Sequence, residues 1–394
     1  MRQLTTIDPI PEGSVLLHIG PPKTGSTSLQ EALFQNRDRL LAEHGVHYPP
    51  TTRHPRPAYA AVSYEVLPTR YHPSDIKRWD RLAAAVRSSP GKRIVLSSET
   101  VSNASTEQAR RIVEDLGGRV SIAISLRPLS QLLASRWQQH VKEQMTLSYP
   151  NWLRQVFDEN SEIRFARQFW HRYRIDDVAA RWAPVIGEEN ITLVVLDPAD
   201  RGRLFGSFEA LLDLPAGALT TEQGTLNTSI PYPTVEVMRR FNRRFNRAGL
   251  PRQYYVRSVE QSGIDTLMTS PAIFAERLPI GTPDWAIERA NAEQQRMNEA
   301  LRATDVGVIG DLDTLIAPAT TRAATGVPDT VPVEAAAEFA FAMFMAAQEF
   351  KPRPTDEPAD GLPLRRVRWT LQHASRRELA RALASSLRRG ARGR

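Results

Sequence analysis

The chain alternates short apolar runs with longer segments of helical periodicity. Four of the runs are mostly apolar along their length, which is typical of strands buried in a parallel sheet. They span residues 14–19, 93–99, 120–126 and 190–197, and a shorter run lies at 306–312. Apolar residues three or four positions apart predict helices at 29–44, 129–142, 165–182 and 234–247. This alternation predicts an α/β fold, in which helices flank both faces of a central parallel sheet.

The segment that follows the first run, Gly20 to Leu29, reads GPPKTGSTSL. Small residues between a strand and a helix expose consecutive backbone N–H groups, the helix adds the positive end of its dipole, and Lys23 adds a point charge. The segment is therefore predicted to form a cradle for phosphate. A Walker A loop places its lysine after the last glycine, whereas Lys23 precedes Gly25, so that motif does not fit. The structural alternative is a serine-rich helix cap with an incidental lysine.

The order P-K-T-G-S-T at the end of the first strand resembles the 5′-phosphosulfate loop of the bacterial sulfotransferases that use 3′-phosphoadenosine-5′-phosphosulfate (PAPS). That family has a P-loop-type three-layer fold, which agrees with the predicted sheet. The resemblance implies that Lys23 stabilises the charge that develops on the bridging oxygen. The residues that it assigns to the donor nucleotide here are Pro22, Lys23, Thr24, Gly25, Ser26, Thr27 and Ser28.

A second motif begins at the end of the strand at 120–126. Arg127 and Pro128 follow this strand, and Ser135 lies eight positions after Arg127 on the predicted helix. The pair resembles the 3′-phosphate signature of the same family. A guanidinium fork suits a terminal phosphate, and a serine hydroxyl can complete its coordination. Alone, the two residues would more commonly be a solvated arginine and a helix-surface serine.

Glu99 ends the run at 93–99 and should project from the carboxyl edge of the sheet, where ligands bind in open α/β folds. Sulfuryl transfer to a hydroxyl needs a general base near the acceptor. The resemblance implies that Glu99 has this role, as in the family branch that uses glutamate. An acid that compensates the dipole of the next helix is the structural alternative. His18, inside the first strand, is the second choice of base, although a core or cleft-edge histidine is the default.

Two loops are weaker sources of ligand contacts. Asn227 and Ser229 resemble a loop that closes over the nucleotide in bacterial members, whereas the alternative is that they cap the following helix. The proline-rich stretch at 47–73 lacks periodicity and is long for a structureless loop. We expect acceptor contacts there, from His54, Arg56 and Tyr59.

Composition excludes several classes of chemistry. The 394 residues include no cysteine, so disulfides, thiolate catalysis and cysteine-based metal sites are excluded. His44 and His47 straddle a helix end without a convincing carboxylate partner, so we expect no metal. The first residues lack an apolar signal core, and no run approaches the roughly 20 apolar residues of a membrane helix. These features predict a cytoplasmic protein.

Positive charge is concentrated at the C-terminus. The formal net charge is +7, while residues 351–394 alone carry 12 Lys and Arg against 4 Asp and Glu, which is +8. A proline-rich connector leads into leucines and arginines at roughly helical spacing, which predicts a basic amphipathic helix able to lie on anionic lipid at the inner face of the membrane. Nucleic acid is the competing partner, although we expect none to bind, and a solvated terminus is the structural alternative.

Together these features predict a sulfotransferase-like α/β domain at 13–316, a helical extension at 317–350, and the connector and basic tail at 351–394. The resemblance implies transfer of a sulfuryl group from PAPS to a hydroxyl, which we expect on a carbohydrate or glycolipid. One rival is a P-loop small-molecule kinase, which would need Mg²⁺ and the missing Gly-Lys-[Ser/Thr] order. Another is a nucleotide-binding protein without catalysis. Acceptor identity and oligomeric state are left open.

Overall fold

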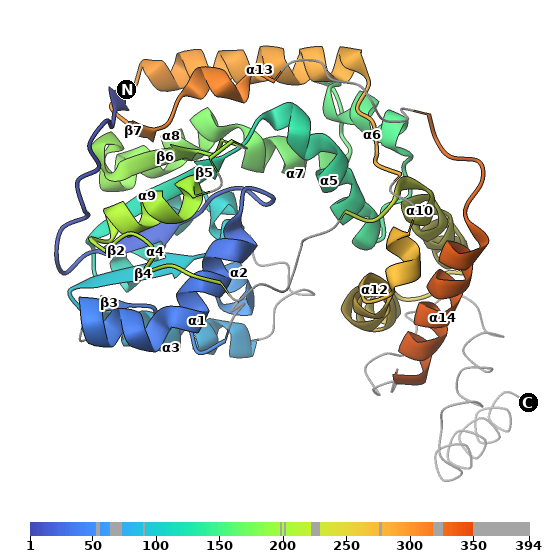
Figure 1. Cartoon of the computed structure of the whole chain (residues 1–394), viewed down its shortest axis with the longest axis horizontal. Coiled ribbons are helices and arrows are strands. Elements are labelled where there is room, and N and C mark those ends of the chain that lie inside the picture. Colours follow the sequence, from blue (N-terminus) through green and yellow to red (C-terminus); the bar gives the residue numbers. More distant parts are fainter. Residues whose placement is uncertain are drawn as a thin grey trace, which may run out of the picture. The chain divides into compact units, whose positions relative to one another are not determined.

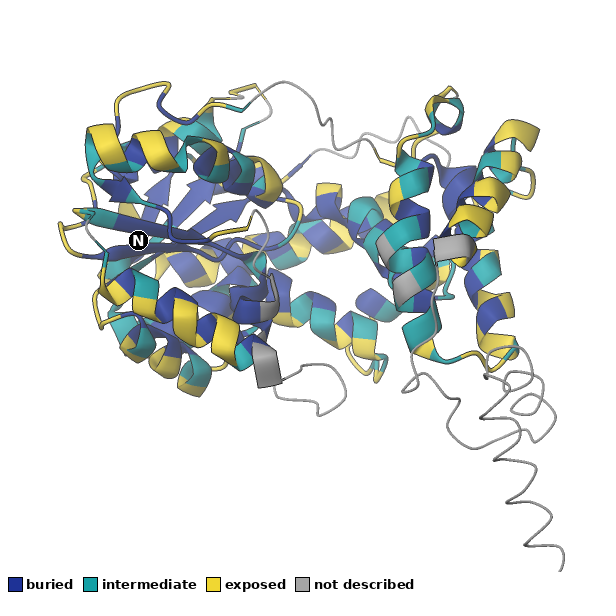
Figure 2. Ribbon diagram, turned by 90° about the horizontal axis from the view of Figure 1, so that it is seen from below, coloured by how far each residue is buried: buried dark blue, intermediate teal, exposed yellow. Residues whose placement is uncertain are grey.

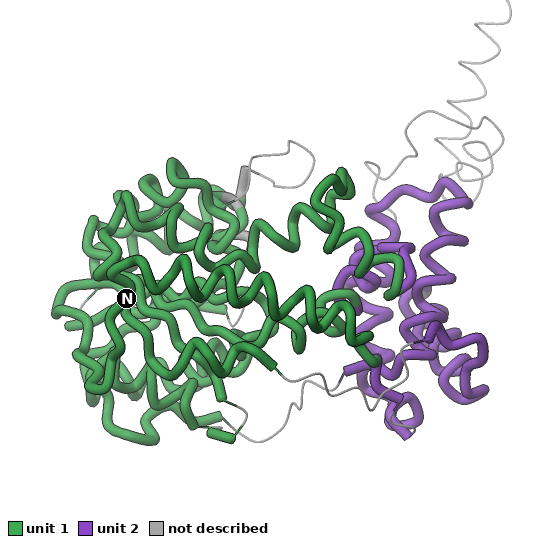
Figure 3. Tube along the Cα trace, turned by 90° about the horizontal axis from the view of Figure 1, so that it is seen from above, with its two compact units in different colours: residues 1–137, 149–228, 281–325 green, residues 138–148, 229–280, 326–394 purple. Residues whose placement is uncertain are grey.

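The structure is a computed structural model. It describes residues 1–52, 56–63, 73–89, 91–197, 199–200, 202–221, 229–275, 278–317 and 326–349. The chain folds into two compact units, which are coloured separately in Figure 3. Unit 1 comprises residues 1–137, 149–228 and 281–325, and unit 2 comprises residues 138–148, 229–280 and 326–394. The predicted stretch 13–316 therefore includes most of unit 1 together with two segments of unit 2.

In the described part of unit 1, seven parallel strands form one sheet in the order β1-β7-β6-β5-β2-β4-β3. The fifth strand in this order, β2, therefore lies between β5 and β4. The chain leaves β2 towards β3 on one side, and it leaves β4 towards β5 on the other. Such a switch point places the carboxyl ends of neighbouring strands beside one crevice, where ligands bind in open α/β sheets. The strands are β1 (Arg2–Gln3), β2 (Val15–His18), β3 (Val46–His47), β4 (Arg93–Ser97), β5 (Val120–Leu126), β6 (Ile191–Val195) and β7 (Gly307–Ile309).

Helices cover both faces of this sheet (Figure 1). Successive residues of β2 point to opposite faces, so Leu17 packs into one hydrophobic cluster and Leu16 into the other. The first cluster includes residues of α2 (Arg56–Ser63), α3 (Pro73–Arg87), α4 (Thr106–Asp115), α8 (Ile175–Ile186) and α13 (Asp284–Arg302). The second includes residues of α1 (Ser26–His44) and α9 (Arg203–Leu211). The predicted three-layer α/β fold is confirmed, and the strands form its buried middle layer (Figure 2).

One predicted helix is two. The segment predicted as a single helix at 165–182 consists of α7 (Arg164–Tyr173) and α8, because Arg174 leaves the helical region with φ −77° and ψ 89°. The break lets α7 pack its aromatic residues on α6 (Tyr149–Val156), where the Trp152 and Phe169 ring centroids lie 5.7 Å apart. The predicted helix at 129–142 is confirmed as α5 (Leu129–Lys142).

Unit 2 consists of helices. It contains α10 (Tyr232–Arg247), α11 (Arg252–Tyr254), the π-helix η3 (Tyr255–Gly263), α12 (Ile264–Met268) and α14 (Val333–Glu349), together with the last residues of α5. Asn242 on α10 donates to the carbonyls of Val141 at 2.8 Å and Met145 at 2.9 Å. The helix α14 lies in the predicted helical extension. Among the residues that the structure describes, no helix is both long and apolar enough to cross a bilayer.

Candidate active site at the carboxyl edge of the sheet

The loop between β2 and α1 has the backbone of an anion cradle. Lys23 and Gly25 both have positive φ, 75° and 90°, a conformation that lets neighbouring N–H groups converge. The first hydrogen bond of α1 runs from the Leu29 amide to the Gly25 carbonyl at 3.1 Å. By helix geometry, the amides at 26–28 therefore point out of the helix end. No side chain in the described part of the chain caps this end of α1.

The side chains of this loop divide into two groups. Lys23, Thr27 and Ser28 are exposed. Thr24 is fully buried, and its hydroxyl donates to the Pro21 carbonyl at 2.7 Å. Its contribution to a bound anion would therefore be its backbone amide. Ser26 is 4% exposed, and its Oγ has no hydrogen-bond partner among the described residues. A buried hydroxyl without a partner at a helix N-terminus fits a site that an anion completes.

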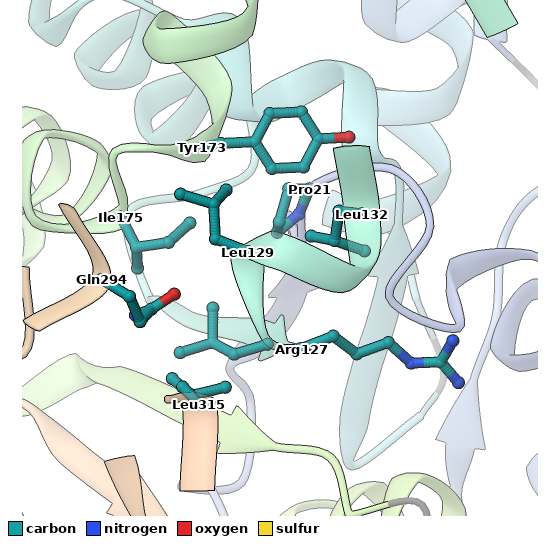
Figure 4. Close-up of a pocket in the computed structure, with 9 residues that line it drawn as sticks. Pro21, Arg127, Leu129, Leu132, Tyr173, Ile175, Gln294 and Leu315 are labelled. Carbon is teal, nitrogen blue, oxygen red and sulfur yellow. The ribbon is translucent and has the colours of Figure 1, made fainter. Parts of the chain in front are cut away.

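Arg127 is exposed and follows β5 directly. It lines a small, largely apolar pocket together with Pro21 of the cradle loop, and Figure 4 shows its side chain reaching away from the leucines of that pocket. Tyr173, from α7, also lines it, and its hydroxyl donates to the Pro22 carbonyl at 3.0 Å. The structure thus brings the first two motifs together at one edge of the sheet. The pocket also includes Leu126, Leu129, Leu132, Ile175, Gln294 and Leu315.

Ser135 lies on α5 and is half-buried. Its hydroxyl donates to the Leu132 carbonyl at 3.0 Å, one turn earlier on the same helix. A serine hydroxyl has one hydrogen, so Ser135 would have to rotate to donate to a phosphate.

Glu99 opens the short helix η1 (Glu99–Asn103) after β4 and is half-buried. Its Oε2 atom accepts a hydrogen bond from Gln30 Nε2 of α1 at 3.1 Å. The same amide nitrogen lies 3.3 Å from the Ser97 carbonyl oxygen. Glu99 is thus at the predicted edge of the sheet, and its carboxylate is tied to the helix that begins at the cradle.

His18 lies in the middle of a buried hydrogen-bonded chain. Its Nδ1 atom is 2.8 Å from Ser97 Oγ on β4, and its Nε2 atom is 2.9 Å from Ser125 Oγ on β5. Ser125 Oγ in turn lies 2.8 Å from Thr24 Oγ1. His18, Thr24 and Ser125 have no exposed surface, and burial lowers the pKa of His18 to about 3. The default expectation of a core histidine is confirmed, and its burial leaves Glu99 as the base candidate.

The number of hydrogens in this chain fixes its direction. Thr24, Ser125, Ser97 and a neutral His18 each supply one hydrogen, and the Pro21 carbonyl only accepts. Four hydrogens fill the four contacts in one way only. Ser97 donates to His18 Nδ1, His18 Nε2–H donates to Ser125, Ser125 donates to Thr24, and Thr24 donates to Pro21. This assigns His18 the Nε2–H tautomer.

No protein-family model matches the chain, and no curated protein matches it. Among solved structures, the crystal structure of a sulfotransferase from Alicyclobacillus acidocaldarius is similar to it at 16% sequence identity and a TM-score of 0.39. The match covers 55% of this chain and 86% of that chain. At this identity, the chemistry has to be argued from the residues of the site.

The other predicted contacts are placed as follows. Asn227 and His54 lie outside the described residues, as does the side chain of Arg56. Ser229 is exposed and belongs to unit 2. The expected acceptor contact from Tyr59 is wrong, because its ring is 1% exposed and packs against Trp79 in the core, with ring centroids 6.1 Å apart. No three His, Asp or Glu side chains gather as a metal site in the described residues.

Sequence reasoning missed three residues that organise the site: Gln30, Ser97 and Ser125. Ser97 is the last residue of β4 and Ser125 lies inside β5, and a polar residue at these buried positions was the available signal. Their relevance depends on the strand order, which places β4 and β5 on either side of β2 and pairs His18 with Ser97.

Proposed function

We propose that the chain is a sulfotransferase that moves a sulfuryl group from PAPS to a hydroxyl of an acceptor. The observation that carries this proposal is that one helix, α1, begins at the proposed phosphosulfate cradle and also holds the proposed base. The N-terminus of α1 forms the anion cradle, and Gln30 of the same helix holds the carboxylate of Glu99. A cradle alone would serve a binding protein, whereas a carboxylate bonded to the same helix suits proton removal.

In the proposed reaction, an acceptor oxygen forms a bond to sulfur as the bond from sulfur to the bridging phosphate oxygen breaks. The products are the sulfated acceptor and 3′-phosphoadenosine-5′-phosphate (PAP). Glu99 takes the acceptor proton, and Lys23 compensates charge on the leaving oxygen. The amides at 24–27 and the free hydroxyl of Ser26 would hold the 5′-phosphosulfate, and Arg127 and Ser135 would hold the 3′-phosphate.

The acceptor class that we propose is a hydroxyl of a carbohydrate or glycolipid, in line with the sequence resemblance. The rival kinase would place a lysine after the last glycine of its loop, and this chain has Ser26 there. The non-catalytic rival has no use for a base at the edge of the sheet.

Calorimetry of the full chain tests the donor site. We expect PAP to bind more tightly than adenosine 5′-monophosphate, because only PAP offers a 3′-phosphate to Arg127. Binding of PAP should not require Mg²⁺. Preference for ATP with Mg²⁺ over PAP would overturn the proposal in favour of the kinase, and equal affinity for PAP and the monophosphate would remove the role given to Arg127.

A further inference from the structure

We infer that Gln30 is a positioning residue for Glu99, and that the buried chain through His18 fixes Gln30 and the cradle in one arrangement. The inference rests on the proposed function, because it gives Glu99 the role of base. Gln30 is 6% exposed and its amide has two hydrogens. One is directed to Glu99 Oε2 at 3.1 Å, and the other faces Ser97, with 3.3 Å to its carbonyl oxygen and 3.4 Å to its Oγ.

Gln30 joins the directed chain at its donor end. Because Ser97 gives its only hydrogen to His18, Ser97 Oγ can only accept from Gln30. The whole sequence of donations then runs from Gln30 across β4, β2 and β5 to the cradle loop, and it ends at the Pro21 carbonyl. If the Gln30 amide were reversed, its oxygen would face the Glu99 carboxylate. The contact with Glu99 and the contact with Ser97 therefore require the same orientation of this amide.

This arrangement serves catalysis by fixing the distance between the cradle and Glu99. A general base must lie within hydrogen-bond reach of the proton that it removes, and small displacements reduce the rate strongly. Gln30 is one turn after the start of α1, so the cradle and the base share a rigid element. The second connection, through His18, consists of buried residues.

The test compares Gln30→Met with Gln35→Met on the same helix. Gln35 also donates to a glutamate, Glu31, at 2.7 Å, but it is exposed and lies more than two turns after the start of α1. We expect Gln30→Met to lower kcat about tenfold or more, while PAP affinity and donor KM stay within about twofold. Gln35→Met should leave all three unchanged. In a Glu99→Gln background, Gln30→Met should have little further effect, because both changes remove one function.

An equal loss of PAP affinity and kcat would overturn the inference, since Gln30 would then shape the cradle rather than the base. If the effects of Gln30→Met and Glu99→Gln on kcat were fully additive, the inference would be overturned as well. Labelling histidine with ¹⁵N gives a readout that is independent of sulfuryl transfer, because His18 should show the Nε2–H tautomer and Gln30→Met should shift its ring signals through Ser97. An Nδ1–H tautomer at His18 would show that the hydrogen-bonded chain does not run in the direction assigned to it. Absence of PAP binding by the wild-type chain would instead refute the proposed function.

A separate observation points to a lipid-binding surface on α14. One side of this helix is buried through Phe339 and Ala342, and the Phe339 ring packs 5.7 Å from that of Phe241. The other side is apolar but exposed at Phe341 (56%), Phe344 (58%) and Met345 (38%). Positions three and four apart lie on one helix face, so these three side chains form a stripe.

We propose that this α14 stripe contacts an anionic lipid surface. The segment that follows it along the chain, residues 351–394, has a net charge of +8, whereas residues 1–350 sum to −1. Exposed phenyl groups and a sequence segment with clustered arginines are the two contributions that hold peripheral proteins on anionic membranes. The predicted helix in this tail lies outside the described residues.

Cosedimentation with vesicles tests the surface. We expect the full chain to bind phosphatidylcholine vesicles that contain phosphatidylglycerol, to bind pure phosphatidylcholine weakly, and to dissociate with salt. The double variant Phe341→Ser/Phe344→Ser should bind roughly tenfold less, and Leu250→Ser, also exposed in unit 2, should bind normally. Wild-type vesicle binding by the double variant would overturn the proposal. A change in oligomeric mass without a change in vesicle binding would assign the stripe to a second copy of the chain.

Discussion

The Nε2 atom of His18 lies 2.9 Å from the Oγ atom of Ser125, and both residues are fully buried. This contact joins β2 to β5, the strand that leads to Arg127, and continues to the cradle through Thr24. The histidine is therefore a structural centre of the site although it has no access to a substrate. Its energetic contribution can be measured apart from catalysis.

Replacing His18 by phenylalanine should destabilise the fold. The ring would still fill the space beside Phe208, whose centroid is 5.1 Å away, but Ser97 and Ser125 would each lose a buried partner. A buried polar group left unpaired costs about 1–3 kcal/mol, so we expect a loss of about 2–4 kcal/mol of unfolding free energy at pH 7.5. Urea unfolding measures it, and an unchanged midpoint would contradict the network.

The His18→Phe variant also tests how the stability of the fold depends on pH. The folded pKa of His18, about 3, is below its ordinary value of 6.5, so the unfolded state binds more protons between these values. Stability is then lost as pH falls below 6.5, by about 2 kcal/mol at pH 5. Because His47 and His171 also have pKa values lowered by burial, the comparison with His18→Phe isolates His18. The difference in unfolding free energy between the wild type and His18→Phe should therefore shrink by this amount when the pH is lowered to 5. If the difference stayed constant, the lowered pKa of His18 would be contradicted.

The position of these residues shows what the sequence could and could not predict. The cradle loop is contiguous, Glu99 ends one apolar run and Arg127 directly follows another, so their placement at the sheet edge followed from local pattern. Gln30, Ser97 and Ser125 act through contacts between segments that lie 67 to 107 positions apart. Such contacts depend on the strand order and on the face that α1 turns to the sheet, and neither is encoded in any one segment.

Lys23→Ala should slow sulfuryl transfer. We expect a loss of about 3 kcal/mol of transition-state stabilisation, or roughly 100-fold in kcat, because one cation placed for the leaving oxygen is removed. Initial rates with saturating PAPS measure the effect. Lys92→Ala is the matched control, since Lys92 is also exposed and pairs with Glu12 at 3.6 Å. Undiminished turnover with unchanged nucleotide affinity would remove Lys23 from the mechanism.

Arg127→Ala should weaken the binding of PAP and leave the binding of adenosine 5′-monophosphate unaffected. A charge-assisted contact to phosphate contributes about 1.5–3 kcal/mol, so PAP affinity should fall about 10- to 150-fold. Calorimetry with both nucleotides distinguishes a lost 3′-phosphate contact from a general disturbance. Arg154→Ala serves as control, because Arg154 is bonded within α6 to Asn151 at 2.8 Å. Parallel losses for both nucleotides would show that Arg127 does not read the 3′-phosphate.

Gly20→Ala tests whether the cradle and the histidine chain are packed as one unit. A Cβ atom at position 20 would lie 2.6 Å from His18 Nε2 and 3.0 Å from the Ser125 backbone nitrogen, and the backbone of a central strand cannot yield. We expect a loss of about 1–3 kcal/mol of stability and weaker PAP binding. Gly206→Ala, in α9, is the same substitution in open space and should stabilise the fold by about 0.5–1 kcal/mol. If chemical denaturation showed the same shift for both variants, the cradle would tolerate a side chain, and the close contact between the loop and His18 would be wrong.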